Sequence, residues 1–331
     1  MTKFGDFETL CHQVPSYPWC NLFYRQVLHH NASLLTGISA NSSSAPVGVN
    51  PECGILRVGH DGSLANIANI IACGFSMIFT LLLIVWTTRR RAAVVNVLPD
   101  RMRLYATLVP WTSRYGGRVE FRIFLVLYFL TIPLQLLSTG SFLEQGSTAL
   151  TAITAVHAGF VAATFWALLG NAIISTQLVE DGTISSLLPF GFFVLAFFAA
   201  TIYISLDVGF TFTSVFGPSS PLVDLNSIAL FILTSIWPAA AAIIYLLLMT
   251  YVVLGMLNEV RPMWYYVLAA VLFVLSQLDF FLLSKVICKA SDKIDGSFIA
   301  TLLETAAVAI LYFAWRSITE ESWEEDIYYP R

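Results

Sequence analysis

The chain has 331 residues, of which 57% are hydrophobic and only 11% are charged, and its mean hydropathy is +0.75. Soluble domains carry roughly 25% charged residues, so this composition excludes an ordinary water-soluble domain and predicts a protein solvated mainly by a lipid bilayer. The formal net charge of -4 provides no basic surface to neutralise phosphates, and no nucleic-acid partner is expected.

Seven segments of the sequence are long and apolar enough to cross a bilayer. A transmembrane helix needs about 20 predominantly apolar residues, since the hydrocarbon core is roughly 30 Å thick and each helical residue adds about 1.5 Å. We therefore predict an all-α fold, a polytopic membrane protein with a bundle of about seven transmembrane helices. The predicted spans are Ile67–Trp86, Ile123–Phe142, Leu150–Ile174, Leu187–Leu206, Ile228–Tyr251, Met263–Leu283 and Phe298–Trp315.

The connection between the first two spans, Thr87–Arg122, predicts the orientation of the chain. It holds eight arginines against two acids, and Lys and Arg resist translocation far more than Asp and Glu do. The connection should be cytosolic, which puts the N-terminus in the lumen and, after seven spans, the C-terminus in the cytosol. The connection Ser284–Ser297 then brings three lysines to the lumenal side, against the same rule. The chain accordingly divides into a lumenal segment (1–66), the bundle (67–315) and a cytosolic tail (316–331).

The N-terminal segment has features of a small lumenal cap. Two sequons begin at Asn31 and Asn41, which are candidate glycosylation sites. Four of the five cysteines would also lie in this oxidising compartment, where disulfides form. Four cysteines allow three pairings, among which the sequence does not choose, although we favour a bridge within the N-terminal segment. The candidate disulfide cysteines are Cys11, Cys20, Cys53 and Cys288.

Three ionisable side chains, His157, Asp279 and Glu304, fall inside the predicted spans. An ionisable residue at mid-span costs roughly 2.5–3.5 kcal/mol on insertion scales, so each is a candidate functional residue. Gly159 belongs to a run of small residues at four-residue spacing, which lets another helix approach closely. These residues either pack inside the bundle or bind a partner, and both interpretations stay open.

The sequence contains no recognisable catalytic, metal or cofactor site. A seven-span zinc hydrolase needs several histidines from different helices, but His157 is the only histidine in the predicted spans. A retinal-binding protein needs a lysine in its last helix, and the seventh span has none. A glycine-rich phosphate-binding loop is also missing. We therefore predict a protein that is not an enzyme, holds no cofactor and works by binding another membrane protein.

The tail Ser317–Arg331 mixes acidic with aromatic residues, and Glu320 and Trp323 are its candidate partner-binding residues. A solvated acidic tail is the simpler interpretation. Aromatic side chains among acids also suit docking onto a basic cytosolic surface or an export-coat adaptor. The arginine-rich first connection sets the topology and can bind anionic membrane lipids.

Six stretches of the sequence, none of them a mechanistic motif alone, together resemble a known family. They are Phe4–Phe7 followed by Cys11, Arg89–Ala93, His157–Asn171, Gln177 with Glu180–Thr183, Ile294–Gly296 leading into Ala300–Thr305, and Trp315–Glu320 with Trp323. In their order and spacing they are similar to the fungal chitin synthase export chaperones, polytopic proteins of the endoplasmic reticulum. The resemblance covers nearly the whole chain.

The resemblance implies that the partner is a chitin synthase, which this chain helps to fold and to leave the endoplasmic reticulum, in support of cell-wall chitin synthesis. It implies residence in the endoplasmic reticulum membrane, and it allows passage to the plasma membrane with the client. The alternative is a seven-helix receptor, which would reach the cell surface without any client. A small-solute transporter would require paired broken helices in two repeated halves, and the sequence shows no such repeat.

Overall fold

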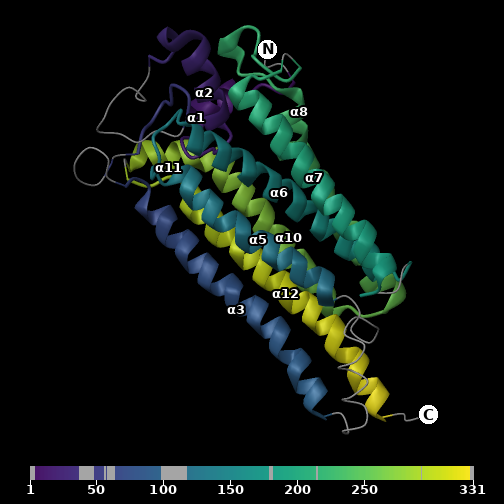
Figure 1. Cartoon of the computed structure of the whole chain (residues 1–331). Helices are drawn as coiled ribbons and strands as arrows, with labels where there is room; N and C mark the ends of the chain where they lie inside the picture. The colour runs from purple at the N-terminus through teal and green to yellow at the C-terminus, as the bar shows by residue number, and fades with distance from the viewer. Residues whose placement is uncertain are drawn as a thin grey trace.

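A computed structural model describes residues 4–36, 48–55, 57, 64–97, 118–178, 182–213, 215–291 and 293–328, and for residues 88–97, 118 and 319–328 it describes the backbone alone. Within these residues the fold is helical (Figure 1), and strand-like pairing is limited to one isolated bridge between Asp6 and Asn226. The all-α prediction is confirmed for this part of the chain.

Seven helices of the described chain are long and apolar enough to cross a membrane, as predicted. The second begins earlier than expected and the fourth ends later, so that each includes one acidic residue, Glu120 and Asp207 respectively. The observed spans are Ile67–Thr87, Val119–Thr139, Thr148–Ser175, Ile184–Phe210, Ile228–Met256, Arg261–Ala290 and Gly296–Ile318.

Five of the seven spans lie in uninterrupted α-helices. The other two are composite: each changes to the wider π-helical turn near the end that faces the N-terminal segment, and the fifth does so again at its other end. The uninterrupted helices are α3 (Ile67–Val97), α5 (Arg118–Thr139), α6 (Thr148–Ser175), α7 (Ile184–Phe210) and α12 (Gly296–Tyr328). The fifth span comprises α8 (Ile228–Phe231), η4 (Ile232–Ile236), α9 (Trp237–Thr250) and η5 (Tyr251–Met256), and the sixth comprises α10 (Arg261–Leu278), η6 (Asp279–Leu283) and α11 (Ser284–Ala290).

Local sequence accounts for several of these boundaries. The Ser147 side chain caps α6 by accepting a hydrogen bond from the Leu150 N–H at 3.2 Å. Pro262 stands in the first turn of α10, where its missing N–H is not needed. Pro238 comes just after the π segment η4, where its missing N–H interrupts the regular hydrogen-bond ladder.

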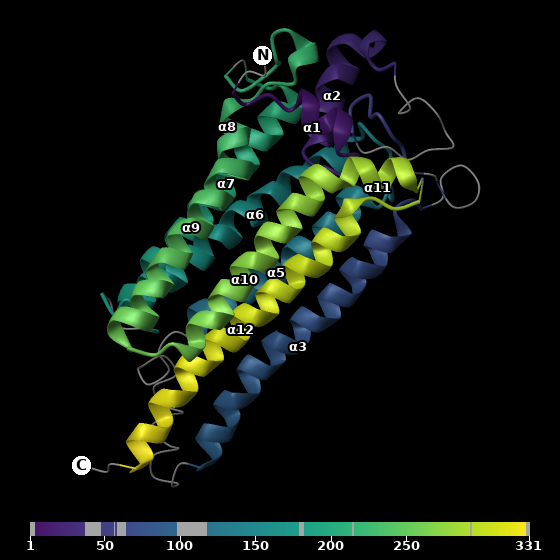
Figure 2. The ribbon, with the colours of Figure 1, turned by 180° about the vertical axis from the view of Figure 1, so that it is seen from behind.

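Helix α6 is the centre of the bundle and α7 lies at its edge. Helix α6 packs against α5, α7 and α9, whereas α12 packs against α3 and α10 (Figures 1 and 2). In their most apolar stretches 56% of the residues of the α6 span are buried, against 11% for α7. The reason is in the sequence, because Ala155, Ala158 and Ala162 are fully buried and let neighbouring helices approach α6 closely.

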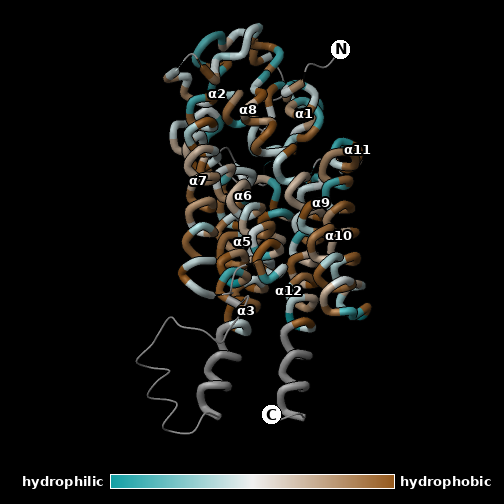
Figure 3. Tube along the Cα trace, turned by 90° about the vertical axis from the view of Figure 1, so that its right-hand side faces the viewer, coloured by the Kyte–Doolittle hydropathy of each residue, from teal (hydrophilic) through white to brown (hydrophobic). Residues whose placement is uncertain are grey.

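The N-terminal segment covers one end of the bundle, and the C-terminal end of α12 lies at the other end (Figure 1). We call residues 4–36 and 48–55 the cap; it contains α1 (Glu8–Gln13), α2 (Cys20–Asn31) and the short 3-10 helix η1 (Ala32–Leu34). Its core side chains Phe7, Leu22 and Phe23 are fully buried. Hydrophilic residues gather mainly in the cap and near the other end of the helices, and hydrophobic residues dominate between them (Figure 3). This distribution fits a bilayer around the middle of the bundle.

Replacing Gly159 with leucine should destabilise the contact between α6 and α7. A Cβ atom at Gly159 would lie 2.6 Å from Cγ1 of Ile202, and overpacking of this kind costs roughly 1–3 kcal/mol. The Gly74→Leu variant on α3 is the matched control, because a Cβ there meets nothing within 4 Å. The melting temperature in detergent should fall below that of the wild-type chain for Gly159→Leu only. Equal melting temperatures for the two variants would contradict this packing.

Candidate functional site

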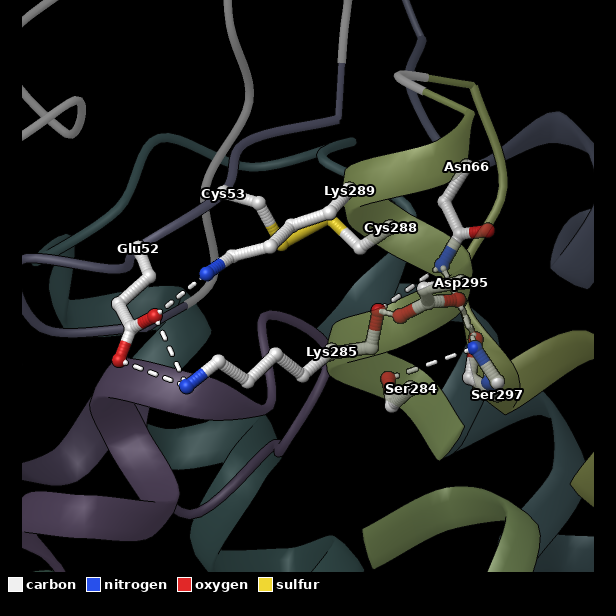
Figure 4. Close-up of a disulfide and its surroundings, with 11 residues drawn as sticks. Glu52, Cys53, Asn66, Ser284, Lys285, Cys288, Lys289, Asp295 and Ser297 are labelled. Atoms are coloured by element: carbon white, nitrogen blue, oxygen red, sulfur yellow. Dashed lines mark hydrogen bonds and ion pairs between the residues drawn. A yellow bond between two sulfur atoms is a disulfide. The ribbon is translucent and has the colours of Figure 1, made fainter. Parts of the chain in front are cut away.

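Two disulfides hold the cap. Cys11 is paired with Cys20 inside the cap, and Cys53 is paired with Cys288 on α11, which lies 235 residues further along the chain (Figure 4). In the chain-entropy model the short bridge stabilises by roughly 3 kcal/mol and the long one by roughly 5 kcal/mol. The second bridge therefore fixes the cap to the sixth span.

An ion pair stands beside the Cys53–Cys288 bridge. The Glu52 carboxylate accepts hydrogen bonds from Lys289 Nζ at 2.9 Å and from Lys285 Nζ at 3.1 Å (Figure 4). The two lysines, Lys289 first, lower the pKa of Glu52 below its usual range. Exposed pairs of this kind contribute little stability, but they give a carboxylate partner to two of the three lysines between the sixth and seventh spans.

Asp295 anchors the cap to the connection between the last two spans. This fully buried carboxylate accepts hydrogen bonds from the Ser16 hydroxyl of the cap, from Asn66 Nδ2 at 3.3 Å and from the Ser297 N–H at 3.2 Å (Figure 4). Burial raises the pKa of Asp295 in spite of these donors. Its function is therefore to hold the cap, the start of α3 and the start of α12 together.

Glu120 and Asp207 form hydrogen bonds between helix ends and neighbouring loops. The sequence alone did not mark either acid as a candidate site residue. Glu120 Oε1 accepts from the Gly182 N–H at 3.0 Å and from the Ser186 hydroxyl at 3.2 Å. Asp207 accepts from the Thr213 N–H at 2.6 Å. Both side chains are fully buried. The sequence did offer one indication, because each acid lies within a few residues of the end of a predicted span. If the helix extends past that end, the acid becomes buried and needs a hydrogen-bond partner.

His157 and Gly159 lie inside the bundle. His157 is 4% exposed, and its ring centroid is 5.1 Å from that of Trp19 in the cap. Gly159 faces Ile202 of α7 so closely that a Cβ would clash. In this structure both residues therefore hold the chain's own helices and cap together.

Asp279 is also buried, at 5% exposure, at the start of the π segment η6. Its backbone carbonyl oxygen would lie only 2.8 Å from a Cβ atom at Gly296, so η6 and the start of α12 approach closely here. Among the described residues its Oδ2 has no hydrogen-bond partner. Burial leaves no room at this position for a side chain from another protein.

Glu304 differs from the other candidates because it is only partly buried. Its Oε1 accepts a hydrogen bond from Gln277 Nε2 at 3.0 Å, which joins α12 to α10. Gln277 is itself partly buried. As a whole residue, Glu304 is therefore less enclosed than His157 or Asp279.

A seam of hydrogen-bonded polar side chains runs along α12 beside Glu304. Thr301 accepts from Gln135 of α5 at 2.9 Å and donates to Asn69 of α3 at 3.1 Å. One turn further, Thr305 donates to Ser76 of α3 at 2.7 Å and is 3.0 Å from the Tyr128 hydroxyl of α5; these contacts tie α12 to two neighbours. Each polar group finds its partner inside the bundle, where a lipid chain could supply none.

The described residues contain no cluster of three or more His, Cys, Asp or Glu side chains that could hold a metal ion. A cavity of about 20 Å³ lies near Asn21, Arg57 and Ser138, and this volume has room for about one water molecule. Neither observation provides a place for a substrate.

The remaining site predictions concern the two ends of the molecule. Asn31 is exposed at the end of α2 in the cap. Asn41 lies outside the described residues. For Glu320 and Trp323 the backbone is helical, as the last part of α12, but their side chains are outside the description.

These features define a multi-pass helical membrane protein whose buried polar groups serve mainly to join its own helices and cap. Comparison with known proteins is more specific. The profile of the family described as "Chitin synthase export chaperone" matches residues 3–97 and 111–328, so the chain belongs to this family. The match includes the described cap and all seven spans.

Individual relatives agree with the family match. The chain is 29% identical to the chitin synthase export chaperone of Chaetomium globosum over 322 residues, 97% of this chain and 84% of that protein. It is 28% identical to the protein of the same description from Gibberella zeae over 325 residues, 98% of this chain and 84% of the relative. Nothing in the fold or the comparisons favours the seven-helix receptor.

Removing the Cys53–Cys288 bridge should loosen the cap. The double variant Cys53→Ser, Cys288→Ser loses the long covalent link and should melt at a lower temperature and expose the cap to limited proteolysis, since native disulfides typically contribute roughly 2–5 kcal/mol. Cys73→Ser is the matched control, because Cys73 is a buried free thiol. Peptide mapping without reductant should recover Cys53 linked to Cys288; a Cys53 linked to Cys11 or Cys20 would contradict the structure.

Proposed function

We propose that this chain binds a chitin synthase in the endoplasmic reticulum membrane and enables its folding and its exit from that compartment. The observation that carries the proposal is the family match over 3–97 and 111–328, which spans the cap and every membrane helix. Relatives bearing the description "Chitin synthase export chaperone" align with 97–98% of the chain. The protein acts by binding and performs no catalysis of its own.

Binding between helical bundles gives a physical account of this role. Helix α7 presents large exposed apolar side chains, among them Leu188 at 68% and Leu195 at 66% exposure, along a span with little burial in its own bundle. A folded client whose spans still have uncovered faces can associate with such a surface through van der Waals packing and a few polar contacts. Because the chaperone binds the folded client in preference, mass action shifts the client towards the export-competent fold.

The orientation that we propose places the cap in the lumen. It brings both disulfides into an oxidising compartment, and it exposes Asn31 to the glycosylation machinery. The arginine-rich connection after α3 and the acidic end of α12 then lie in the cytosol, where the former can meet anionic lipids. After export the chain can accompany its client to the plasma membrane.

The cytosolic end of α12 is the proposed contact with the export machinery. The helix runs on to Tyr328, ten residues past the end of the span at Ile318, and it projects from the end of the bundle opposite the cap (Figure 2). This extension carries Glu320 and Trp323. A helix with acidic and aromatic residues suits a basic surface on an export-coat adaptor.

Deleting the gene should leave a chitin synthase in the endoplasmic reticulum and lower cell-wall chitin, as followed by imaging a tagged synthase. The synthase should also co-purify with the wild-type chain from gently solubilised membranes.

Replacing the acids Glu320, Glu321, Glu324, Glu325 and Asp326 with lysine should leave co-purification intact but keep the client in the endoplasmic reticulum, because only the charge of the cytosolic contact is reversed. Normal client export in the deletion strain would refute the function, and normal export with the reversed tail would refute the role of the tail alone.

Glycan mapping should test the orientation. We expect endoglycosidase treatment to lower the apparent mass of the wild-type chain, and Asn31→Gln to remove one of the shifts, because Asn31 is exposed in the cap. Asn41→Gln is the companion variant. A sequon introduced after Tyr328 should stay unmodified. Modification of that added sequon, with none at Asn31 or Asn41, would show that the topology is inverted.

A further inference from the structure

Glu304 receives fewer hydrogen bonds from the chain itself than two of the buried acids at the ends of the bundle, Asp207 and Asp295. Asp207 accepts hydrogen bonds from the N–H groups of Thr213 and Phe216, at 2.6 and 3.3 Å. Asp295 accepts from three residues. Glu304 has one hydrogen-bond partner among the described residues, the neutral amide of Gln277. The chain's own hydrogen bonds therefore satisfy the carboxylates of Asp207 and Asp295 more fully than that of Glu304.

The position of Glu304 makes this difference matter. It lies eight residues after Gly296, the first residue of its span, which puts it about 12 Å along the helix from the cap side. No described Lys or Arg forms an ion pair with it. A lone carboxylate at that depth in hydrocarbon is costly, and such residues usually mark a functional contact.

The geometry around Glu304 leaves part of the carboxylate free for such a contact. Gln277 holds Oε1 at 3.0 Å, which fixes the orientation of the carboxylate. Oε2 has no hydrogen bond among the described residues, and the side chain is only partly buried. By contrast, His157 and Asp279 are at most 5% exposed, so neither can receive a side chain from another helix without opening the bundle.

We propose that Glu304, oriented by Gln277, binds a lysine or arginine side chain carried within a membrane span of the client. This inference rests on the proposed function and specifies the chemistry of the client contact. A basic residue in a span is as costly to bury alone as an acidic one. Pairing the two inside the membrane neutralises both charges in a medium where their attraction is strong, so the contact selects client spans that carry an unpaired cation.

Designed single-span guests can test this contact without knowledge of the natural client. The guest is a polyleucine helix with one Lys placed about eight residues from one end, to match the depth of Glu304. Matched guests carry Leu, Ser or Glu at that position. Each is reconstituted with the full-length chain in lipid nanodiscs, and the bound fraction is measured by fluorescence transfer. The wild-type chain should bind the Lys guest at least about tenfold more tightly than the Leu guest, a difference of about 1.4 kcal/mol.

Three variants of the chain complete the experiment. Glu304→Gln, which keeps the size of the side chain, should abolish the preference for Lys, and Glu304→Lys should transfer it to the Glu guest. Gln135→Leu removes a different partly buried polar group of the seam and should leave the preference unchanged. Melting temperatures show that each variant is folded.

Two results would overturn the inference. The first is equal binding of the Lys, Ser and Leu guests by the wild-type chain. This result needs no variant, so it would overturn the inference even if Glu304→Gln failed to fold. The second is retention of the Lys preference in a folded Glu304→Gln chain. In either case, continued co-purification of the synthase with the wild-type chain would leave the proposed function standing.

Discussion

The need to satisfy polar groups where the solvent offers no hydrogen bonds governs this structure. In a bilayer, backbone groups are satisfied by helix formation and side-chain groups must find partners in the protein. Thr301 and Thr305 do this by joining α12 to α3 and α5. Helix ends follow the same rule, because Glu120 and Asp207 accept hydrogen bonds from the loops that follow α6 and α7. Polar residues thus specify which helices meet, in a protein where hydrophobicity alone would not distinguish them.

The cap adds a second level of organisation at one end. Phe7 packs against Phe231 of α8 with ring centroids 5.7 Å apart, and Tyr17 packs against Phe281 of η6 at 5.8 Å. The cap therefore bridges the fifth and sixth spans, each of which changes to a π-helical turn at this level. Burial raises the pKa of Tyr17 to about 12. The disulfide to Cys288 makes the same connection covalent.

The contrast between polar side chains buried inside the bundle and apolar side chains on its outer faces bears on partner binding. Residues that look reactive in the sequence, such as His157 and Asp279, are buried in the chain's own contacts. The outward surface consists largely of apolar helix faces, and Glu304 and Gln277 are polar residues of the spans that are only partly buried. A chaperone for a polytopic client has use for both features: broad apolar faces give affinity within the membrane, and a single oriented charge gives selectivity.

The sequence by itself determined the seven membrane helices and the family, because the length and apolarity of a span are local properties and the resemblance extends along the whole chain. It also pointed to Glu304, since a charge inside an apolar window is visible without a structure. It could not assign the pairing of Cys53 with Cys288, the burial of Asp279 or the anchoring role of Asp295. The disulfide and the Ser16–Asp295 contact join segments more than 200 residues apart. Only tertiary packing decides such features, because a side chain's partner is set by the position of its helix in the bundle and not by its neighbours in the chain.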